Sequence, residues 1–169
     1  MPRVHIQADR HEDVRRSDPR VPRGGAARIR SSGRLIRRRI LVAEDDPASV
    51  ELVQAYLETK GYDVSAALDG NLALEMGGTG EYDLLILDVH MPLYGGVEVL
   101  HMLRKRLLSH PIKVIALTAD DRTSVRDELR RDGVDSYLIK PVSLAHLGDE
   151  VSRLLAGAPA PRRAAPPLA

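Results

Sequence analysis

An aliphatic run that ends in a carboxylate is the feature that most constrains this chain. Leu84 to Leu87 are consecutive large apolar residues, and Asp88 follows them directly. A strand with one exposed face alternates apolar and polar residues, so an unbroken apolar run predicts a strand covered on both faces. Ligands of open α/β sheets bind in the crevice outside the carboxyl ends of such strands. Asp88 is therefore predicted to lie at a binding edge.

The same strand pattern recurs and alternates with helical patterns. The predicted strands span residues 40–43, 62–67, 84–88, 112–117 and 134–139. The predicted helices span residues 47–60, 69–76, 97–108, 121–131 and 143–155. Because crossovers between parallel strands are right-handed, this alternation predicts an α/β fold with a doubly wound five-stranded parallel sheet and helices on both faces.

The alternating pattern occupies residues 38–156 and leaves a segment on each side. Residues 1–37 form an Arg-rich leader and residues 157–169 an Ala/Pro-rich tail, and both are predicted to be disordered because they offer little apolar surface to bury. Residues 1–39 hold 12 arginines and four acidic residues, whereas residues 40–156 hold 11 basic and 20 acidic residues. A basic leader thus precedes one acidic domain.

Several classes of protein are excluded or disfavoured by what the sequence lacks. It contains no cysteine, which excludes disulfides, thiolate catalysis and Cys-ligated metals. No apolar segment approaches the roughly 20 residues of a membrane span, and no signal-peptide core is present, so a cytoplasmic location is expected. Phosphate-binding glycine loops are absent, and the six histidines have no metal-ligand spacing.

Polar residues follow the predicted strands at the binding edge. They are Glu44, Asp45, Asp46, Asp88, Thr118 and Lys140. Asp46 is predicted to cap the first helix, but carboxylates gathered without a function would repel one another. Hard oxygen ligands select Mg²⁺, and a carboxylate beside that metal can act as a nucleophile toward phosphorus. A lysine and a hydroxyl would then neutralise and hydrogen-bond the phosphoryl oxygens.

Four ordered motifs give the chain its resemblance to the response regulator receiver family of two-component signalling. They are ILVAEDDP (40–47), LDVHMP (87–92), ALTA (116–119) and SYLIKP (136–141). Their key residues are separated by 43 positions from Asp45 to Asp88, 30 to Thr118 and 22 to Lys140. The resemblance covers about residues 39–156 and implies a flavodoxin-like (βα)5 fold with strand order 2-1-3-4-5, as in a stand-alone receiver domain like those of chemotaxis regulators.

The resemblance implies a role for each matching residue. Asp88 corresponds to the phosphoacceptor, which takes its phosphoryl group from a sensor histidine kinase or a histidine phosphotransfer protein. Thr118 and Lys140 correspond to the residues that bind this group. Mg²⁺ would be held by Glu44, Asp45, Asp88 and the backbone carbonyl of His90. Glu44 stands where aspartate is commoner. The His90 side chain either alters the access of water to the phosphoryl group, and hence how long that group persists, or is an exposed loop side chain of which only the backbone carbonyl matters.

The resemblance also implies a switch. Thr118 and Tyr137 match its two residues: as Thr118 is drawn to the phosphoryl group, Tyr137 would turn inward and remodel the face made by the fourth helix, fifth strand and fifth helix. The peptide bond between Lys140 and Pro141 is expected to be cis.

The resulting expectation is a phosphorylation-activated, single-domain response regulator that signals through protein contacts. Beyond Mg²⁺-dependent self-phosphorylation and autodephosphorylation it would not be an enzyme, and it would be a monomer or a weak, phosphorylation-dependent dimer. An alternative is a regulator whose basic arm binds nucleic acid or a membrane; no aromatic residues are interleaved with the arginines to stack on bases, which disfavours nucleic acid. An aspartyl phosphatase is disfavoured because His90 replaces the second aspartate of one such class.

Overall fold

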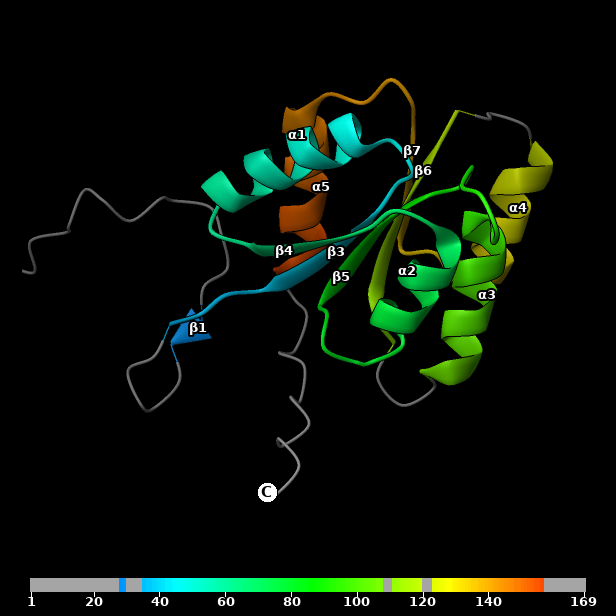
Figure 1. Ribbon diagram of the computed structural model, residues 1–169, viewed down its shortest axis with the longest axis horizontal. Coiled ribbons are helices and arrows are strands. Elements are labelled where there is room, and N and C mark those ends of the chain that lie inside the picture. The colour runs from blue at the N-terminus through cyan, green and yellow to red at the C-terminus, as the bar shows by residue number, and fades with distance from the viewer. Residues whose placement is uncertain (1–27, 30–34, 108–110, 120–122, 157–169) are drawn as a thin grey trace, which may run out of the picture.

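A computed structural model describes residues 28–29, 35–107, 111–119 and 123–156. Its body is a central sheet flanked by helices (Figure 1). The strands of this sheet are β3 (Arg39–Ala43), β4 (Asp63–Ala67), β5 (Leu84–Asp88), β6 (Lys113–Thr118) and β7 (Ser136–Ile139). The helices are α1 (Pro47–Thr59), α2 (Gly70–Gly77), α3 (Gly96–Arg106), α4 (Thr123–Arg131) and α5 (Leu144–Leu155).

The sheet is parallel throughout, and its strands lie in the order β4-β3-β5-β6-β7. Counted along the sheet's own five strands, this is the order 2-1-3-4-5. The predicted α/β fold with a doubly wound, flavodoxin-like sheet is therefore confirmed. From β3 the chain adds β4 on one side of the sheet and then β5, β6 and β7 on the other side. The carboxyl ends of β3 and β5 therefore lie next to each other at the topological switch point, where α/β proteins bind ligands.

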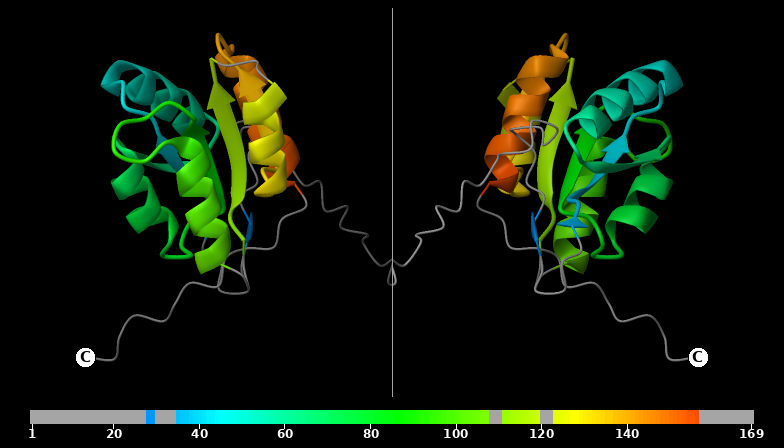
Figure 2. Two further views of the ribbon diagram at one scale, coloured as in Figure 1. Left: turned by 90° about the vertical axis from the view of Figure 1, so that its right-hand side faces the viewer. Right: turned by 90° about the vertical axis from the view of Figure 1, so that its left-hand side faces the viewer.

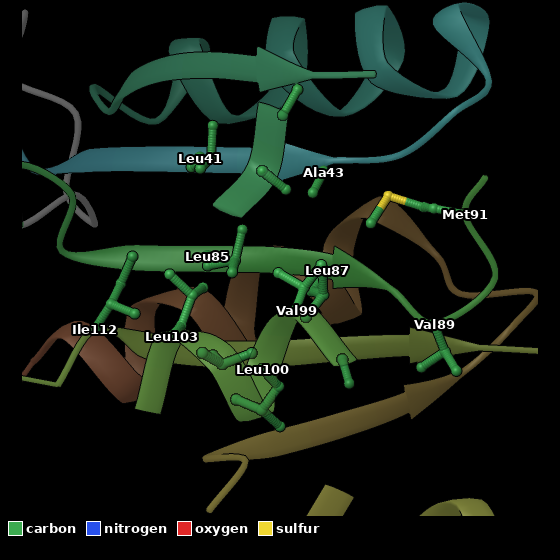
Figure 3. Close-up of a cluster of buried hydrophobic side chains, with 14 of the residues drawn as sticks. Leu41, Ala43, Leu85, Leu87, Val89, Met91, Val99, Leu100, Leu103 and Ile112 are labelled. Atoms are coloured by element: carbon green, nitrogen blue, oxygen red, sulfur yellow. The ribbon is translucent and has the colours of Figure 1, made fainter. Parts of the chain in front are cut away.

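The core has two halves because successive residues of each strand point to opposite faces of the sheet. On one face, Leu85 and Leu87 pack against Val99, Leu100 and Leu103 of α3 (Figure 3). On the other face of the sheet, the alternate residues of the strands pack against side chains from α1 and α5. All five residues of β5 are buried, which is the two-sided burial that its unbroken aliphatic run predicts.

The helices begin at side chains that cap them. Asp46 accepts hydrogen bonds from the amides of Ala48 (3.4 Å) and Ser49 (3.1 Å) before α1. Asp69 and Ser143 cap α2 and α5 in the same way. These contacts satisfy amides that the first turn of a helix leaves unpaired, and they set where each helix starts relative to the preceding strand.

Strand β7 is shorter than predicted, because the expected strand began at residue 134 and the observed one begins at Ser136. The carboxylate of Asp135 accepts hydrogen bonds from the Val114 amide (2.9 Å), Lys113 Nζ (2.7 Å) and Arg104 Nη2 (3.1 Å). A side chain thus takes the place of a ladder bond at this position. The aspartate ties α3, β6 and β7 together at the end of the sheet opposite the candidate site.

The amino-terminal boundary of the domain is marked by a buried ion pair. Arg38 precedes β3, is 4% exposed and pairs with the carboxylate of Asp83, which also accepts a hydrogen bond from the Arg39 amide (2.8 Å). Most of the predicted leader and tail lies outside the described residues; within the leader, β1 (Arg28–Ile29) and β2 (Leu35–Ile36) pair antiparallel. Across the described part of the chain, no helix has both the length and the apolar character to cross a membrane.

Helix α5 carries an ion pair that makes stability depend on pH. Arg153 donates to both carboxylate oxygens of Glu150, at 2.9 and 2.6 Å, and these hydrogen bonds lower the pKa of Glu150 to about 2. Since this folded-state pKa lies below the ordinary value of 4.5, the pair stabilises the protein above pH 4.5 and loses its effect as the pH falls through about 2.

We therefore expect Glu150→Gln to lower the free energy of unfolding by about 1 kcal/mol at pH 7, a modest value because Arg153 is largely exposed. The deficit should vanish near pH 2 in urea denaturation curves. Glu51→Gln, at an exposed position of α1, serves as the control. A deficit that is equal at both pH values would contradict this assignment.

Candidate functional site

The carboxyl ends of β3, β5, β6 and β7 bring the candidate residues together. Ala43 lies beside Leu87, Asp88 beside Leu117, and Thr118 beside Ile139 in the strand register. The residues that end or follow these strands are therefore neighbours at one edge of the sheet. Glu44, Asp88 and Lys140 meet there through hydrogen bonds, although they are far apart in the sequence.

The ammonium group of Lys140 bridges two buried carboxylates. Its Nζ donates to Glu44 Oε2 at 2.7 Å and to Asp88 Oδ2 at 2.8 Å. Glu44 and Asp88 are only 6% and 4% exposed, whereas the Lys140 side chain is 31% exposed. The lysine thus reaches into the site from its solvent side and supplies a positive charge where two negative charges lie close together.

The surroundings shift the pKa values of two of these groups. Burial raises the pKa of Glu44, and the neighbouring Asp88 carboxylate raises it further, while the hydrogen bond from Lys140 opposes both effects. Burial alone would lower the pKa of Lys140, but its hydrogen bonds to Asp88 and Glu44 outweigh this and raise it. The site therefore holds more negative charge than the lysine neutralises.

Three carboxylates of the site lie close enough together to hold a metal ion. Ligand oxygens of Glu44, Asp45 and Asp88 all lie within 4.8 Å of one another, and Asp45 is exposed while the other two are buried. With Lys140 they carry a net charge of two negative units, which a divalent cation would balance. An all-oxygen donor set of this kind suits Mg²⁺. Asp46 lies outside the cluster and caps α1.

The loop after β5 is fixed against Asp88 by short contacts. The amide of His90 donates to Asp88 Oδ1 at 3.0 Å, and the Gly96 amide donates to the Val89 carbonyl at 2.9 Å. A Cβ atom on Gly96 would come within 2.4 Å of the Asp88 carbonyl oxygen. Only glycine permits α3 to start this close to Asp88. The predicted helix began at residue 97, so sequence reasoning missed the role of Gly96, which a helix start so soon after Asp88 could have indicated.

Leu93 in this loop adopts a left-handed backbone conformation, with φ of 70°, and its side chain is 76% exposed. Left-handed geometry costs a leucine about 1 to 2 kcal/mol, whereas asparagine tolerates it better. We expect Leu93→Asn to raise the free energy of unfolding by about 0.5 to 1 kcal/mol. Urea denaturation would measure the gain, with Leu68→Asn, at an exposed position without positive φ, as the control. A loss of stability in Leu93→Asn would contradict the assignment.

Thr118 lies at the same edge, at the end of β6, whereas Tyr137 lies within β7, two residues before its last residue. Thr118 ends β6 with its side chain fully buried, and its carbonyl accepts a hydrogen bond from the Lys140 amide at 2.8 Å. The peptide bond between Lys140 and Pro141 is cis. Tyr137 contacts α4 instead of the carboxylates: its hydroxyl accepts a hydrogen bond from Arg126 Nε at 3.0 Å. Sequence reasoning did not anticipate this arginine contact.

Comparison with known proteins gives a match over most of this domain. The family model described as the response regulator receiver domain matches residues 40–152. The alkaline phosphatase synthesis transcriptional regulatory protein PhoP of Bacillus subtilis (strain 168) is 38% identical over 118 residues, which are 70% of this chain and 48% of that protein. The chain thus spans about half the length of the curated regulators that it matches.

Solved structures with similar folds include two receiver domains. The Francisella response regulator 1452 receiver domain matches with a TM-score of 0.64 and 35% identity over 69% of this chain and 95% of that one. The receiver domain of the sensor histidine kinase PA1611 from Pseudomonas aeruginosa PAO1 matches with a TM-score of 0.65 and 27% identity over 72% of this chain and all of that one. In the latter structure, a magnesium ion is coordinated in the active-site cleft.

Proposed function

Since this chain belongs to the response regulator receiver domain family of two-component systems, we propose that it is a switch activated by phosphorylation of Asp88. Domains of this family serve in signalling and receive phosphoryl groups from histidine kinases. The observation that carries the proposal is the buried Asp88 carboxylate, which shares one ammonium group with Glu44 and lies within 4.8 Å of two other carboxylates. A carboxylate in such a cluster can act as a nucleophile only when positive groups nearby balance the negative charges of the cluster.

The proposed reaction is transfer from a phosphohistidine of a sensor kinase or phosphotransfer protein. One carboxylate oxygen of Asp88 attacks phosphorus, so that an O–P bond forms as the N–P bond breaks, and the released imidazole takes up a proton. Lys140 already contacts Asp88 Oδ2 and would pair with an oxygen of the bound phosphoryl group. The Thr118 hydroxyl, at the end of the neighbouring strand, would donate a hydrogen bond to another.

Mg²⁺ is the proposed cofactor, and the carboxylates of Glu44, Asp45 and Asp88 with the His90 carbonyl would hold it. The bound ion would offset the negative charge of the site and of the incoming phosphoryl oxygens. Asp45 is exposed and suited to direct ligation, while Glu44 would act through water because its carboxylate is buried against Lys140. Autodephosphorylation, by water attack on the acyl phosphate, would take place in the same site.

The proposed output is a change of protein contacts on the face formed by α4, β7 and α5. The side views in Figure 2 show these three elements together at the β7 end of the sheet. Tyr137 lies on β7 and Thr118 on β6, so a movement linked to the phosphoryl group would reach this face first. Binding of a partner to this face, or formation of a weak dimer, would then depend on whether Asp88 is phosphorylated.

The metal requirement tests this proposal. With acetyl phosphate as donor, we expect phosphorylated protein on a phosphate-affinity gel when Mg²⁺ is present and none in EDTA. Asp45→Asn should need at least about tenfold more Mg²⁺ for the same rate, since it loses one charged ligand. Asp46→Asn is the matched control, because asparagine still caps α1 and Asp46 lies outside the carboxylate cluster. Equal Mg²⁺ requirements for the two variants would refute the assigned ligands.

A further inference from the structure

Tyr137 is held by two arginines of α4, at its hydroxyl and over its ring. Both Arg126 Nε, at 3.0 Å, and Arg126 Nη2 donate to the tyrosine oxygen, and Arg130 Nη2 lies 3.5 Å from it. The guanidinium carbons of Arg126 and Arg130 lie 5.0 and 5.7 Å from the centre of the ring. These are cation–π distances, so the arginines hold the ring by its face as well as by its hydroxyl.

These contacts matter because α4 has little apolar attachment to the core. Of its residues, all of which the structure describes, Leu129 alone is buried, and Val125 is partly buried against the same cluster. The remaining side chains of α4 are polar or charged. The bonds from Arg126 to Tyr137 therefore supply a specific polar link between this helix and β7.

The strand register defines where the tyrosine ring can go. Tyr137 pairs with Ala116 on β6, and Thr118 is two residues farther on, so Ala116 and Thr118 point to the same face of the sheet as Tyr137. Ala116 is small and separates the ring from Thr118. A tyrosine that turned toward Thr118 over this alanine would have to give up its hydrogen bonds to Arg126.

We propose that Arg126 is a positioning residue of the switch, which holds Tyr137 against α4 and so opposes its inward turn until Asp88 is phosphorylated. This inference rests on the proposed function. Arg126 does not touch the carboxylate site; it acts through Tyr137. Release of the tyrosine would at the same time loosen α4 from β7, which couples the movement of one ring to the surface that partners would read.

The ionisation of Tyr137 offers a direct readout of this contact. The hydrogen bond from Arg126 is the largest cause that lowers the pKa of Tyr137, and the charges of both arginines add to it. A role of Arg126 that did not act through Tyr137 would leave no such mark on this phenol. Protein labelled with ¹³C at the tyrosine ζ carbon reports each of the five tyrosines in the NMR spectrum, and Tyr137→Phe assigns the signal.

In this titration we expect Arg126→Met to raise the pKa of Tyr137 above that of the wild type, and Arg126→Lys to restore part of the difference. Arg131→Met is the matched control, because Arg131 lies on the same helix, is 73% exposed and pairs with Glu128 at 3.9 Å. An unchanged Tyr137 titration in Arg126→Met, or an equal change in Arg131→Met, would overturn the inference.

The link to the switch is tested with Mg²⁺ and beryllofluoride, a stable stand-in for the phosphoryl group. If Arg126 opposes the active state, Arg126→Met should reach half-saturation at about fivefold to tenfold lower beryllofluoride than the wild type or Arg131→Met, as the loss of its partly buried hydrogen bonds to Tyr137 predicts. Equal half-saturation of Arg126→Met and wild type would overturn the positioning role alone. Failure of the wild type to bind beryllofluoride at all would overturn the proposed function and this inference together.

Discussion

In Mg²⁺-free buffer at pH 7, we expect Lys140→Met to lower the free energy of unfolding by about 2 to 3 kcal/mol. The lysine Nζ lies 2.7 Å from Glu44 Oε2 and 2.8 Å from Asp88 Oδ2, and both carboxylates are buried. Its removal leaves two negative charges facing each other with little water to screen them. The expected loss is below that of a fully buried pair because the lysine is partly exposed.

The loss should depend on pH in a defined direction. The pKa of Glu44 is already raised by burial and by Asp88, and it rises further when the opposing hydrogen bond from Lys140 is removed. A carboxyl group whose folded-state pKa is raised binds more protons in the folded than in the unfolded protein, so stability falls as the pH rises above 4.5 through the raised value. The deficit of Lys140→Met should therefore be smaller at pH 5 than at pH 7.

Urea denaturation at the two pH values would measure these effects. Lys113→Met is the matched control: Lys113 Nζ lies 2.7 Å from Asp135, but its side chain is 40% exposed and Asp135 keeps a hydrogen bond from Arg104. We expect this control to lose less than about 1 kcal/mol, as solvent-exposed pairs do. Equal losses in the two variants would show that Lys140 does not offset a strong repulsion between the carboxylates of Glu44 and Asp88.

The fold and most of the candidate site follow from local sequence patterns. Unbroken aliphatic runs such as Leu84–Leu87 indicate two-sided burial, and parallel strands bring their carboxyl ends to one edge, which places Glu44, Asp88 and Lys140 together. Helix starts were equally local, since Asp46 and Asp69 hydrogen-bond amides only two or three residues away. Patterns of this kind need no knowledge of distant contacts.

Contacts between distant charged residues could not be predicted in the same way. Arg38 belongs to a basic stretch, and nothing local distinguishes it from Arg37, yet the structure buries Arg38 against Asp83, 45 positions away. Asp135 was assigned to the strand predicted over residues 134–139, whereas its carboxylate accepts the hydrogen bond of the Val114 amide in place of a ladder bond. The partners of these side chains are fixed by how the strands pack.

Helix α4 illustrates the same limit. Val125 and Leu129 are its only apolar residues, and of the two only Leu129 is fully buried. The hydrogen bond from Arg126 to Tyr137 joins residues 11 positions apart on different elements. Its existence depends on the angle at which α4 lies against β7, which no local pattern determines.

The largest expected effect on function is the loss of phosphorylation in Asp88→Asn. Asparagine keeps an oxygen that can accept the His90 amide and removes one of the buried charges, so we expect the variant to fold with at least the stability of the wild type in Mg²⁺-free buffer. It has no carboxylate at this position to attack phosphorus. Asp69→Asn, which retains a helix cap far from the carboxylate cluster in sequence, is the control and should be phosphorylated like the wild type.

Intact mass spectrometry after incubation with Mg²⁺ and acetyl phosphate measures this difference directly. We predict the gain of one phosphoryl group on the wild type and on Asp69→Asn, and no gain on Asp88→Asn. No gain on the folded wild type, or the same gain on Asp88→Asn, would contradict the proposal that Asp88 is the phosphoacceptor through which this protein signals.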